Sequence, residues 1–272
     1  MKLIKYFLVA VVTSSTIFIS CSTVLLTGRS QLNLIQDSEM LAMSFQQYGQ
    51  FLNENPLSNN QANVDMVKRV GLNIQIAVED YMAQNNLSGY LEGYSWEFNL
   101  VESDQANAWA MPGGKVVVYS GLLNVTQVET GLAVVMGHEI AHAIAEHGNE
   151  RMSQQLLQQA GAIGLMIAMK DEPVQTQAIW LGVYGIGTTV GIMLPYSRTH
   201  ESEADHLGLI FMSMAGYDPQ IAPEFWERMA AGKEGEPPEF LSTHPSDQTR
   251  IDDLNSWMPE AMKYYKGQHD NN

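Results

Sequence analysis

The stretch that decides the fold is His138-Glu139-Ile140-Ala141-His142, an HExxH pattern. The residues around it, 127 to 147, carry apolar side chains at helical spacing, and Gly148 is expected to end the helix. Positions i and i+4 of a helix lie about 40° apart around the axis and about 6 Å apart along it, so both imidazoles can bind one ion. Zinc suits this pair, and Glu139 is placed to take a proton from the attacking water. The pattern predicts one zinc ion per chain, bound by His138 and His142.

A catalytic zinc ion needs a third protein ligand and one open position. The metzincin continuation would place a glycine at position 145 and a histidine at position 148, but the chain has Ala145 and Gly148 there. His147 is one position out of register with that pattern. The third ligand is therefore expected further along the chain.

Two carboxylates on a later predicted helix meet this requirement. Glu201 and Asp205 lie one helical turn apart, so both can face the same site. We expect Glu201 to bind the metal and Asp205 to hold the imidazole of His138 in place, since such a partner orients a ligand ring. Glu203 points about 200° away from Glu201 around an ideal helix and is expected on a solvated face.

The sequence on either side of the motif predicts a mixed fold. Helical spacing extends over 32–52 and 64–82, and short β-rich runs cover 94–101 and 115–119, with a turn at 110–114. Further helices are predicted at 200–214, 219–230 and 246–257. The predicted fold class is α+β, mainly helical, with a small sheet beside the HExxH helix.

Two stretches, 156–169 and 178–194, are the most apolar ones beyond the N-terminal segment. Neither reaches 18 unbroken apolar residues, the length typical of a membrane-spanning helix. We expect buried helices that pack closely through the glycines of the second stretch, Gly182, Gly185, Gly187 and Gly191. The alternative is a hairpin that dips into a membrane.

Composition excludes one class of partner. The 272 residues include 14 Lys and Arg against 30 Asp and Glu, a formal net charge of -16. A field of this sign repels nucleic acid, so nucleic-acid binding is not expected.

The N-terminus resembles a secretory signal peptide. Two lysines precede an apolar run, residues 6–19, that is too short to span a bilayer comfortably. The sole cysteine, Cys21, closes Phe18-Ile19-Ser20-Cys21, a loose bacterial lipobox, and is the expected lipidation site. The predicted location is the bacterial cell envelope, as an outer-membrane lipoprotein facing the periplasm. An uncleaved signal anchor, or an ordinary signal with an incidental cysteine, is the alternative.

Several further motifs carry a family resemblance. They are Asn107-Ala108-Trp109-Ala110-Met111-Pro112-Gly113-Gly114, Ser120-Gly121-Leu122-Leu123, Met136-Gly137-His138-Glu139, Ser197-Arg198 with Glu201 and Ala204-Asp205, and His244-Pro245 with Arg250-Ile251. With them the chain resembles the HtpX and CAAX-prenyl-protease type of gluzincin metallopeptidase, above all its soluble envelope members, from about residue 60 to about residue 257. The resemblance implies a zincin-like fold, one zinc ion, and cleavage of protein substrates in or at a membrane.

The resemblance also suggests roles for residues outside the HExxH motif. Asn107, Ala108 and Trp109 would belong to an edge strand that pairs with an extended substrate, or else to an ordinary internal strand. His244 would cap the zinc in a resting state or polarise the substrate carbonyl, unless it is only a turn residue. Arg250 is either structural or stabilises the oxyanion.

The expected organisation is a signal peptide (1–20), an N-terminal segment and helix (21–60), a zinc metallopeptidase domain (61–260) and a short polar tail (261–272). The expected function is hydrolysis of peptide bonds in misfolded or misassembled envelope proteins. A non-hydrolytic chaperone or assembly factor and a membrane-embedded processing peptidase are the alternatives. Expected partners are protein or peptide substrates and a membrane, reached through the N-terminal lipid; the sequence leaves the oligomeric state open.

Overall fold

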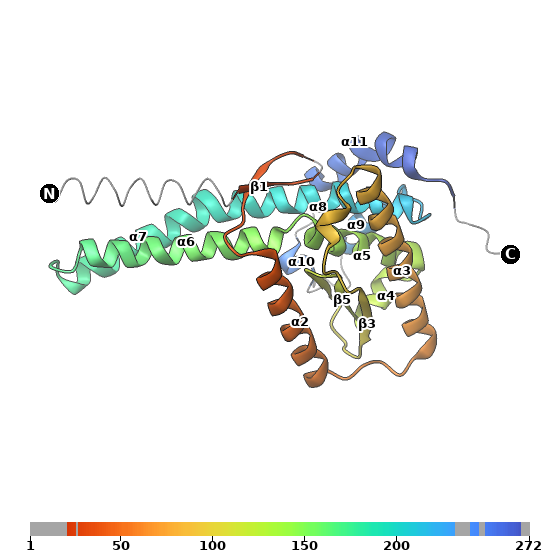
Figure 1. Ribbon diagram of the computed structural model, residues 1–272, viewed down its shortest axis with the longest axis horizontal. Helices are drawn as coiled ribbons and strands as arrows, with labels where there is room; N and C mark the ends of the chain where they lie inside the picture. Colours follow the sequence, from red (N-terminus) through yellow and green to blue (C-terminus); the bar gives the residue numbers. More distant parts are fainter. Residues whose placement is uncertain (1–20, 26, 232–239, 245–247, 268–272) are drawn as a thin grey trace. The chain divides into compact units, whose positions relative to one another are not determined.

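The computed structural model describes residues 21–25, 27–231, 240–244 and 248–267, and it divides the chain into two compact units (Figure 1). One unit joins the residues up to Asp37 to Glu146–Arg198, and the other joins Ser38–Ala145 to the residues from Thr199 onward. The expected signal peptide, residues 1–20, lies outside the described residues. The predicted fold class, mainly helical with small sheets, is confirmed. The expected domain boundaries stay a prediction.

The larger unit carries the HExxH motif. Its elements are α2 (Asp37–Glu54), α3 (Gln61–Gln84), a 3-10 turn (Ser88–Leu91), β3 (Glu97–Val101), β4 (Ala108–Met111), β5 (Lys115–Tyr119), a 3-10 turn (Ser120–Leu122), α4 (Leu123–Thr126), α5 (Glu129–Ile144), most of α8 (Leu194–Met214), α9 (Ile221–Ala231), α10 (Phe240–Thr243) and α11 (Gln248–Tyr264). The helices predicted on either side of the motif are therefore present, with shifted ends.

The sheet of the larger unit has three strands in the order β3-β5-β4. Strand β5 is parallel to β3 and antiparallel to β4, with Ala108 opposite Val118 and Met111 opposite Lys115. The turn between β4 and β5 uses Gly113 and Gly114, both at positive φ (88° and 79°), a conformation that glycine adopts without strain. Strand β4 contacts α5 and lies at the edge of the sheet. The small sheet beside the HExxH helix is thus confirmed.

Helix α5 is buried on nearly every side. Leu132, Val135 and Met136 have no exposed surface, and α5 packs against α3, whose Val70 and Ile74 are also fully buried. A helix that is apolar all round belongs in a core. The motif is thereby held in the buried core of the larger unit.

The predicted end of this helix at Gly148 is wrong. Helix α5 ends at Ile144, and Glu146 adopts a left-handed backbone conformation (φ 58°). A second helix, α6, then begins at His147, so Gly148 lies inside its first turn. A single left-handed residue interrupts the helical hydrogen bonds without a glycine, because a polar residue tolerates this conformation at a modest cost.

The smaller unit consists of a short hairpin and two long helices. Its elements are β1 (Cys21–Thr23), β2 (Ser30–Leu32), α6 (His147–Ala168), α7 (Val174–Thr188), a π-helical turn (Thr189–Met193) and the first residues of α8. Strands β1 and β2 are antiparallel. Arg29 binds both oxygens of the buried Glu150 at 2.9 and 2.8 Å, which ties this hairpin to the start of α6.

The expectation that 156–169 and 178–194 are buried is wrong. Most of their large apolar side chains are exposed; Ile167 is 66% and Ile186 69% exposed. A Cβ atom added at Gly182, Gly185 or Gly187 would meet nothing within 4 Å, so these glycines mediate no close packing among the described residues. The cause is architectural, because α6 and α7 pack chiefly on each other and a two-helix hairpin leaves each helix with its outer surface uncovered.

Candidate metal centre

Two glycines bring the halves of the site together. A Cβ atom at Gly208 of α8 would lie 2.8 Å from the backbone nitrogen of His138, and one at Gly137 of α5 would lie 3.0 Å from the carbonyl oxygen of Gly208. The two backbones therefore touch at this crossing, where only glycine fits. The crossing places the second half of α5 beside the first half of α8, which carries Glu201 and Asp205.

The three residues predicted as metal ligands lie close together. Nε2 of His138 lies 3.1 Å from Nε2 of His142 and 3.3 Å from Oε2 of Glu201. Nε2 of His142 lies 3.4 Å from Oε1 of Glu201. His244 completes the group, with Nδ1 at 3.1 Å from Nε2 of His138 and 2.9 Å from Oε2 of Glu201.

This donor set fits zinc. The donor atoms of His138, His142, Glu201 and His244 all lie within 4.8 Å of one another. Zinc bonds of about 2.0–2.1 Å in a tetrahedron put ligand atoms about 3.3 Å apart, close to the separations found here. Imidazole and carboxylate are also ligands that zinc prefers. Three of these ligands would leave one coordination position open, and His244 is placed to fill it.

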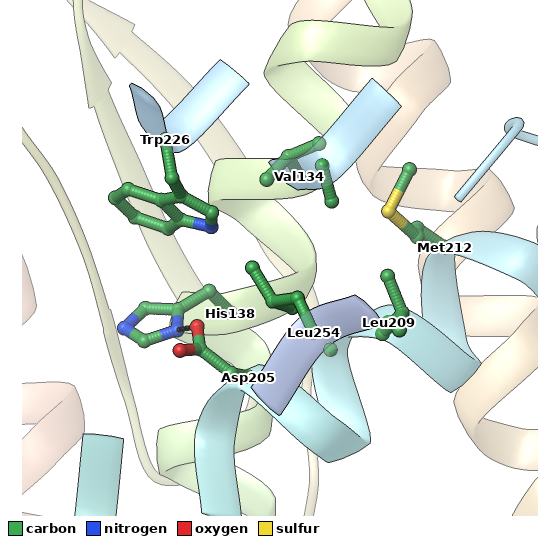
Figure 2. Close-up of a pocket in the computed structure, with 9 residues that line it drawn as sticks. Val134, His138, Asp205, Leu209, Met212, Trp226 and Leu254 are labelled. Atoms are coloured by element: carbon green, nitrogen blue, oxygen red, sulfur yellow. Dashed lines mark hydrogen bonds and ion pairs between the residues drawn. The ribbon is translucent and has the colours of Figure 1, made fainter. Parts of the chain in front are cut away.

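Asp205 lies beside His138, the residue that it is predicted to orient. Its Oδ1 lies 2.8 Å from Nδ1 of His138, so a proton on Nδ1 can be donated to the carboxylate while Nε2 keeps its lone pair for a metal. Figure 2 shows this pair beside a small pocket whose other lining groups are chiefly apolar, among them Val134, Leu209 and Trp226. The imidazole is therefore oriented by its hydrogen bond to Asp205, with apolar side chains on the pocket side of the pair and the other ligand candidates beside Nε2.

Arg250, whose role the sequence left open, binds Asp205. Its Nη2 lies 2.6 Å from Oδ1 of Asp205, and its guanidinium carbon lies 3.4 Å from the centroid of the Trp226 ring. Both charged groups are buried, at 6% and 4% exposed. The arginine thus neutralises the carboxylate that orients His138, and the arrangement favours a structural role over oxyanion binding.

Glu139 lies at the open side of the ligand group. Its side chain is 6% exposed, and Oε1 lies 3.4 Å from Nε2 of His244. The same Oε1 has no hydrogen-bond donor among the described residues, although it is buried. Burial raises the pKa of this carboxyl, and the nearby His244 and His138 only partly oppose the increase. A buried oxygen without a donor beside a metal-ligand set is suited to receive a proton from a bound water.

The carboxylates make the site attractive to a cation. Burial alone would raise the pKa of Glu201, but hydrogen bonds from His138, His142 and His244 outweigh it and hold that pKa well below its usual range. Burial likewise disfavours the charged form of His138, yet hydrogen bonds to Asp205 and Glu201 raise its pKa to about 9. The same negative charges that favour an imidazolium favour a divalent metal at Nε2.

Aromatic rings that the sequence did not single out hold the histidines. Phe240 stacks on His244 with centroids 4.5 Å apart, and Trp226 lies edge-on to His138 at 5.6 Å. Both rings are buried. Trp226 lies in an ordinary amphipathic helix, so no pattern along the chain indicated its role, whereas Phe240 lies four residues before His244, a spacing of one helical turn that could have indicated their contact.

The expectation for Glu203 is wrong. The residue was placed on a solvated face because it points away from Glu201, but it is only 4% exposed. The face of α8 opposite the metal-ligand group is itself covered, because Ala204, Leu207 and the residues that follow are buried as well. An angle around one helix cannot show which neighbours cover its other side.

The predicted edge strand is present. Strand β4 begins at Ala108, directly after Asn107, and includes Trp109. The amide of Tyr119 on β5 donates to the carbonyl of Asn107 at 3.0 Å, so the backbone of Asn107 faces β5. Because facing alternates along an antiparallel pair, the backbone groups of Ala108 and Ala110 point away from β5. Substrate pairing at this edge stays a prediction.

Comparison with known proteins identifies relatives. The model of Peptidase family M48 matches residues 71–258. The mitochondrial metalloendopeptidase OMA1 of Schizosaccharomyces pombe is 39% identical over 169 residues, covering 61% of this chain and 48% of the relative. Human mitochondrial OMA1 is 30% identical over 250 residues, covering 88% of this chain and 46% of the relative. The beta-barrel assembly-enhancing protease of Escherichia coli is 35% identical over 164 residues, covering 58% and 33%. The chain spans about half the length of these relatives or less.

The relatives correct the predicted location. Residues 18–21 were interpreted as a lipobox, which placed the chain in a bacterial cell envelope as an outer-membrane lipoprotein. Proteins similar to this chain include mitochondrial enzymes of fungi, plants and animals. A short N-terminal motif is weaker grounds for a location than similarity over most of the chain, so the predicted location is wrong. Lipidation of Cys21 itself is untested.

Proposed function

The chain belongs to peptidase family M48, and from this premise we propose that it is a zinc-dependent endopeptidase. The observation that carries the proposal is the convergence of His138, His142 and Glu201 around one point, with the buried carboxylate of Glu139 beside them. A structural zinc site has no need of such a carboxylate, whereas hydrolysis needs a group that accepts and returns a proton.

Each residue of the site has a separate role in the proposed hydrolysis. His138, His142 and Glu201 would hold the ion, which when bound polarises a peptide carbonyl and makes a water molecule a stronger acid. Glu139 takes the proton of the attacking water and delivers it to the leaving amine. Asp205 keeps Nε2 of His138 directed at the ion, and Arg250 keeps Asp205 in place.

The outer edge of β4, to which no strand pairs among the described residues, supplies the means to bind a substrate. The outward carbonyl of Ala108 and the outward amide and carbonyl of Ala110 can pair with an extended peptide in the manner of an added strand, while the amide of Ala108 donates to Oδ1 of Asn107 at 2.9 Å. Phe240 already donates its amide to the carbonyl of Ala106 at 3.2 Å, so pairing along this edge begins there. Backbone pairing tolerates many sequences but requires an unfolded segment, and this supports misfolded or misassembled proteins as the substrate class.

His244 supports a resting state with a closed site. Its Nδ1 would supply a fourth donor to an ion held by His138, His142 and Glu201. Its Nε2 lies 3.4 Å from Oε1 of Glu139, where an attacking water would have to lie. Phe240 stacks on its ring and holds it there. The active enzyme then requires α10 and His244 to withdraw.

Hydrolysis of casein by the purified full-length protein tests the proposal. The parent, Glu139→Gln and the control Glu79→Gln, at an exposed position of α3, are compared, with the zinc content of each measured. We expect one zinc per chain in all three and cleavage in the parent and the control only. Zinc in all three with cleavage in none, even after His244→Ala, would support a non-hydrolytic chaperone instead. Absence of zinc from all three would refute the metal site.

A further inference from the structure

The hairpin of α6 and α7 is polar inside and apolar outside. Between the helices, Nε2 of Gln158 donates to Oγ1 of Thr188 at 2.6 Å, and the hydroxyl of Tyr184 donates to the carbonyl of Gln158 at 3.1 Å. A Cβ atom at Gly161 would clash with the Tyr184 hydroxyl, so the two helices approach closely there. Hydrogen bonds and small residues between helices are typical of packing inside a membrane.

The outer surfaces of both helices carry large apolar side chains. On α6 and α7 these include Ile163, Met166, Ile167, Ile179, Val183 and Ile186, each at least 44% exposed. In a water-soluble hairpin the charged and polar side chains would occupy these outer surfaces. The arrangement is therefore the reverse of the one that water favours.

Charged residues are confined to the two ends of the hairpin. No Asp, Glu, Lys or Arg occurs in Met152–Met169 or in Pro173–Ser197. As helices these spans are about 27 Å and about 37 Å long, comparable to the ~30 Å hydrocarbon core of a bilayer. Lys170, Asp171 and Glu172 form the tip, while Arg151 and Arg198 bound the base. The hairpin can therefore keep every charge in a headgroup layer.

The continuous helix Val174–Met214 is the one helix among the described residues that is long and apolar enough to cross a membrane. Core helices of soluble proteins often pass this test, but none of the apolar window of this helix is buried. Signal sequences also pass it, but this helix lies far from the N-terminus. Neither of these two alternatives accounts for the apolar window of this helix.

A hairpin lying flat on a membrane would keep one polar side toward water. Here large apolar side chains are exposed on both helices; the exposed glutamines of α6, Gln155 and Gln159, lie in the first half of its uncharged span, and Gln175 of α7 lies beside the tip. We propose that the α6–α7 hairpin crosses a lipid bilayer and carries its tip, Lys170-Asp171-Glu172, to the far side. The membrane segment then interrupts the chain between the ligands His142 and Glu201. This inference does not depend on peptidase activity.

Site-directed fluorescence tests whether the hairpin enters lipid. The full-length protein carries one cysteine, so Cys21→Ser permits single labelled cysteines at Ile186→Cys on α7 and, as the matched control, Leu72→Cys on α3. Both native side chains are exposed, at 69% and 50%. In phosphatidylcholine vesicles we expect doxyl-labelled lipid to quench the probe at position 186 and aqueous iodide to quench the probe at position 72.

Labelling from one side of sealed vesicles tests whether the hairpin crosses the bilayer. Protein with a C-terminal tag is reconstituted at fewer than one chain per vesicle, and sealed vesicles that display the tag are selected. An impermeant maleimide should label Leu72→Cys at once and Glu172→Cys only after detergent is added. Labelling of both before detergent would overturn the crossing. Iodide quenching at position 186 without lipid quenching would overturn insertion altogether, and a disulfide between two Ile186→Cys chains would then identify a second copy as the occupant.

Discussion

Oδ1 of Asp205 lies 2.6 Å from Nη2 of Arg250 and 2.8 Å from Nδ1 of His138, so one oxygen joins a buried cation to a metal-ligand histidine. Each of these three residues depends on the other two. The carboxylate needs the guanidinium because an unpaired charge is costly in apolar surroundings. The imidazole needs the carboxylate to present Nε2 to the ion. Stability and metal affinity are therefore coupled at this point.

Arg250→Met should destabilise the fold. Removing one partner of a buried ion pair leaves the other charge unpaired, at a cost of about 3–5 kcal/mol. Urea unfolding with a chelator present measures the loss. Arg228→Met is the matched control, because Arg228 lies 3.8 Å from Glu224 at the surface and such pairs are worth about 1 kcal/mol or less. Equal losses in both variants would show that Arg250 does not stabilise Asp205.

Asp205→Asn should weaken zinc binding while keeping the fold. The amide has the shape of the carboxylate but lacks its charge, and loss of such a partner commonly costs about 10–100-fold in metal affinity. Competition with a chromophoric chelator gives the dissociation constant. Asp252→Asn, at an exposed position of α11, should leave it unchanged. An unchanged constant for Asp205→Asn would mean that the orientation of His138 does not depend on this contact.

His244→Ala should increase casein hydrolysis. The substitution opens the fourth position of the ligand group and removes the side chain 3.4 Å from Glu139. Zinc content should stay at one ion per chain, because three ligands remain. A lower kcat would assign His244 to the reaction rather than to a closed resting state, and an unchanged rate would remove it from both roles.

Ala110→Pro should weaken substrate binding and leave stability nearly intact. Its amide points away from β5, so proline removes a donor at the free edge without breaking the ladder. KM for casein should increase more than kcat decreases. Trp109→Pro is the contrast, since its backbone faces β5 and its substitution should reduce the free energy of unfolding. An unchanged KM for Ala110→Pro would argue against strand pairing.

Glu146 should make stability depend on pH. Burial raises its pKa from 4.5 to about 7, an effect that Asp37 reinforces and a hydrogen bond from Asn33 opposes. The folded protein therefore keeps a proton that the unfolded chain loses, and stability falls as pH increases from about 4.5 to about 7. Urea unfolding across this range should show a shallower fall for Glu146→Gln than for the parent. Glu172→Gln, exposed at the hairpin tip, should follow the parent, and parallel curves for all three would refute the effect.

Local patterns predicted much of the site. The spacing of His138 and His142, and of Glu201 and Asp205, follows from the helical repeat alone, because residues four apart share a face. The edge strand and its glycine turn can likewise be recognised from consecutive residues of the sequence. The approach of α5 to α8, which brings these two pairs of residues together, depends on Gly137 and Gly208. The importance of these glycines is visible only in the structure, where the two helices cross.

The sequence by itself thus determines which chemical groups each helix carries, whereas the tertiary structure determines which surfaces are covered. The burial of Glu203, the pairing of Arg250 with Asp205 and the edge-on contact of Trp226 with His138 all depend on residues from separate elements. The apolar stretches of α6 and α7 have the composition of core helices, yet their side chains face outward. The hydrophobicity of a segment indicates that its side chains avoid water. The surface that covers them is determined by contacts between distant parts of the chain, or by a membrane.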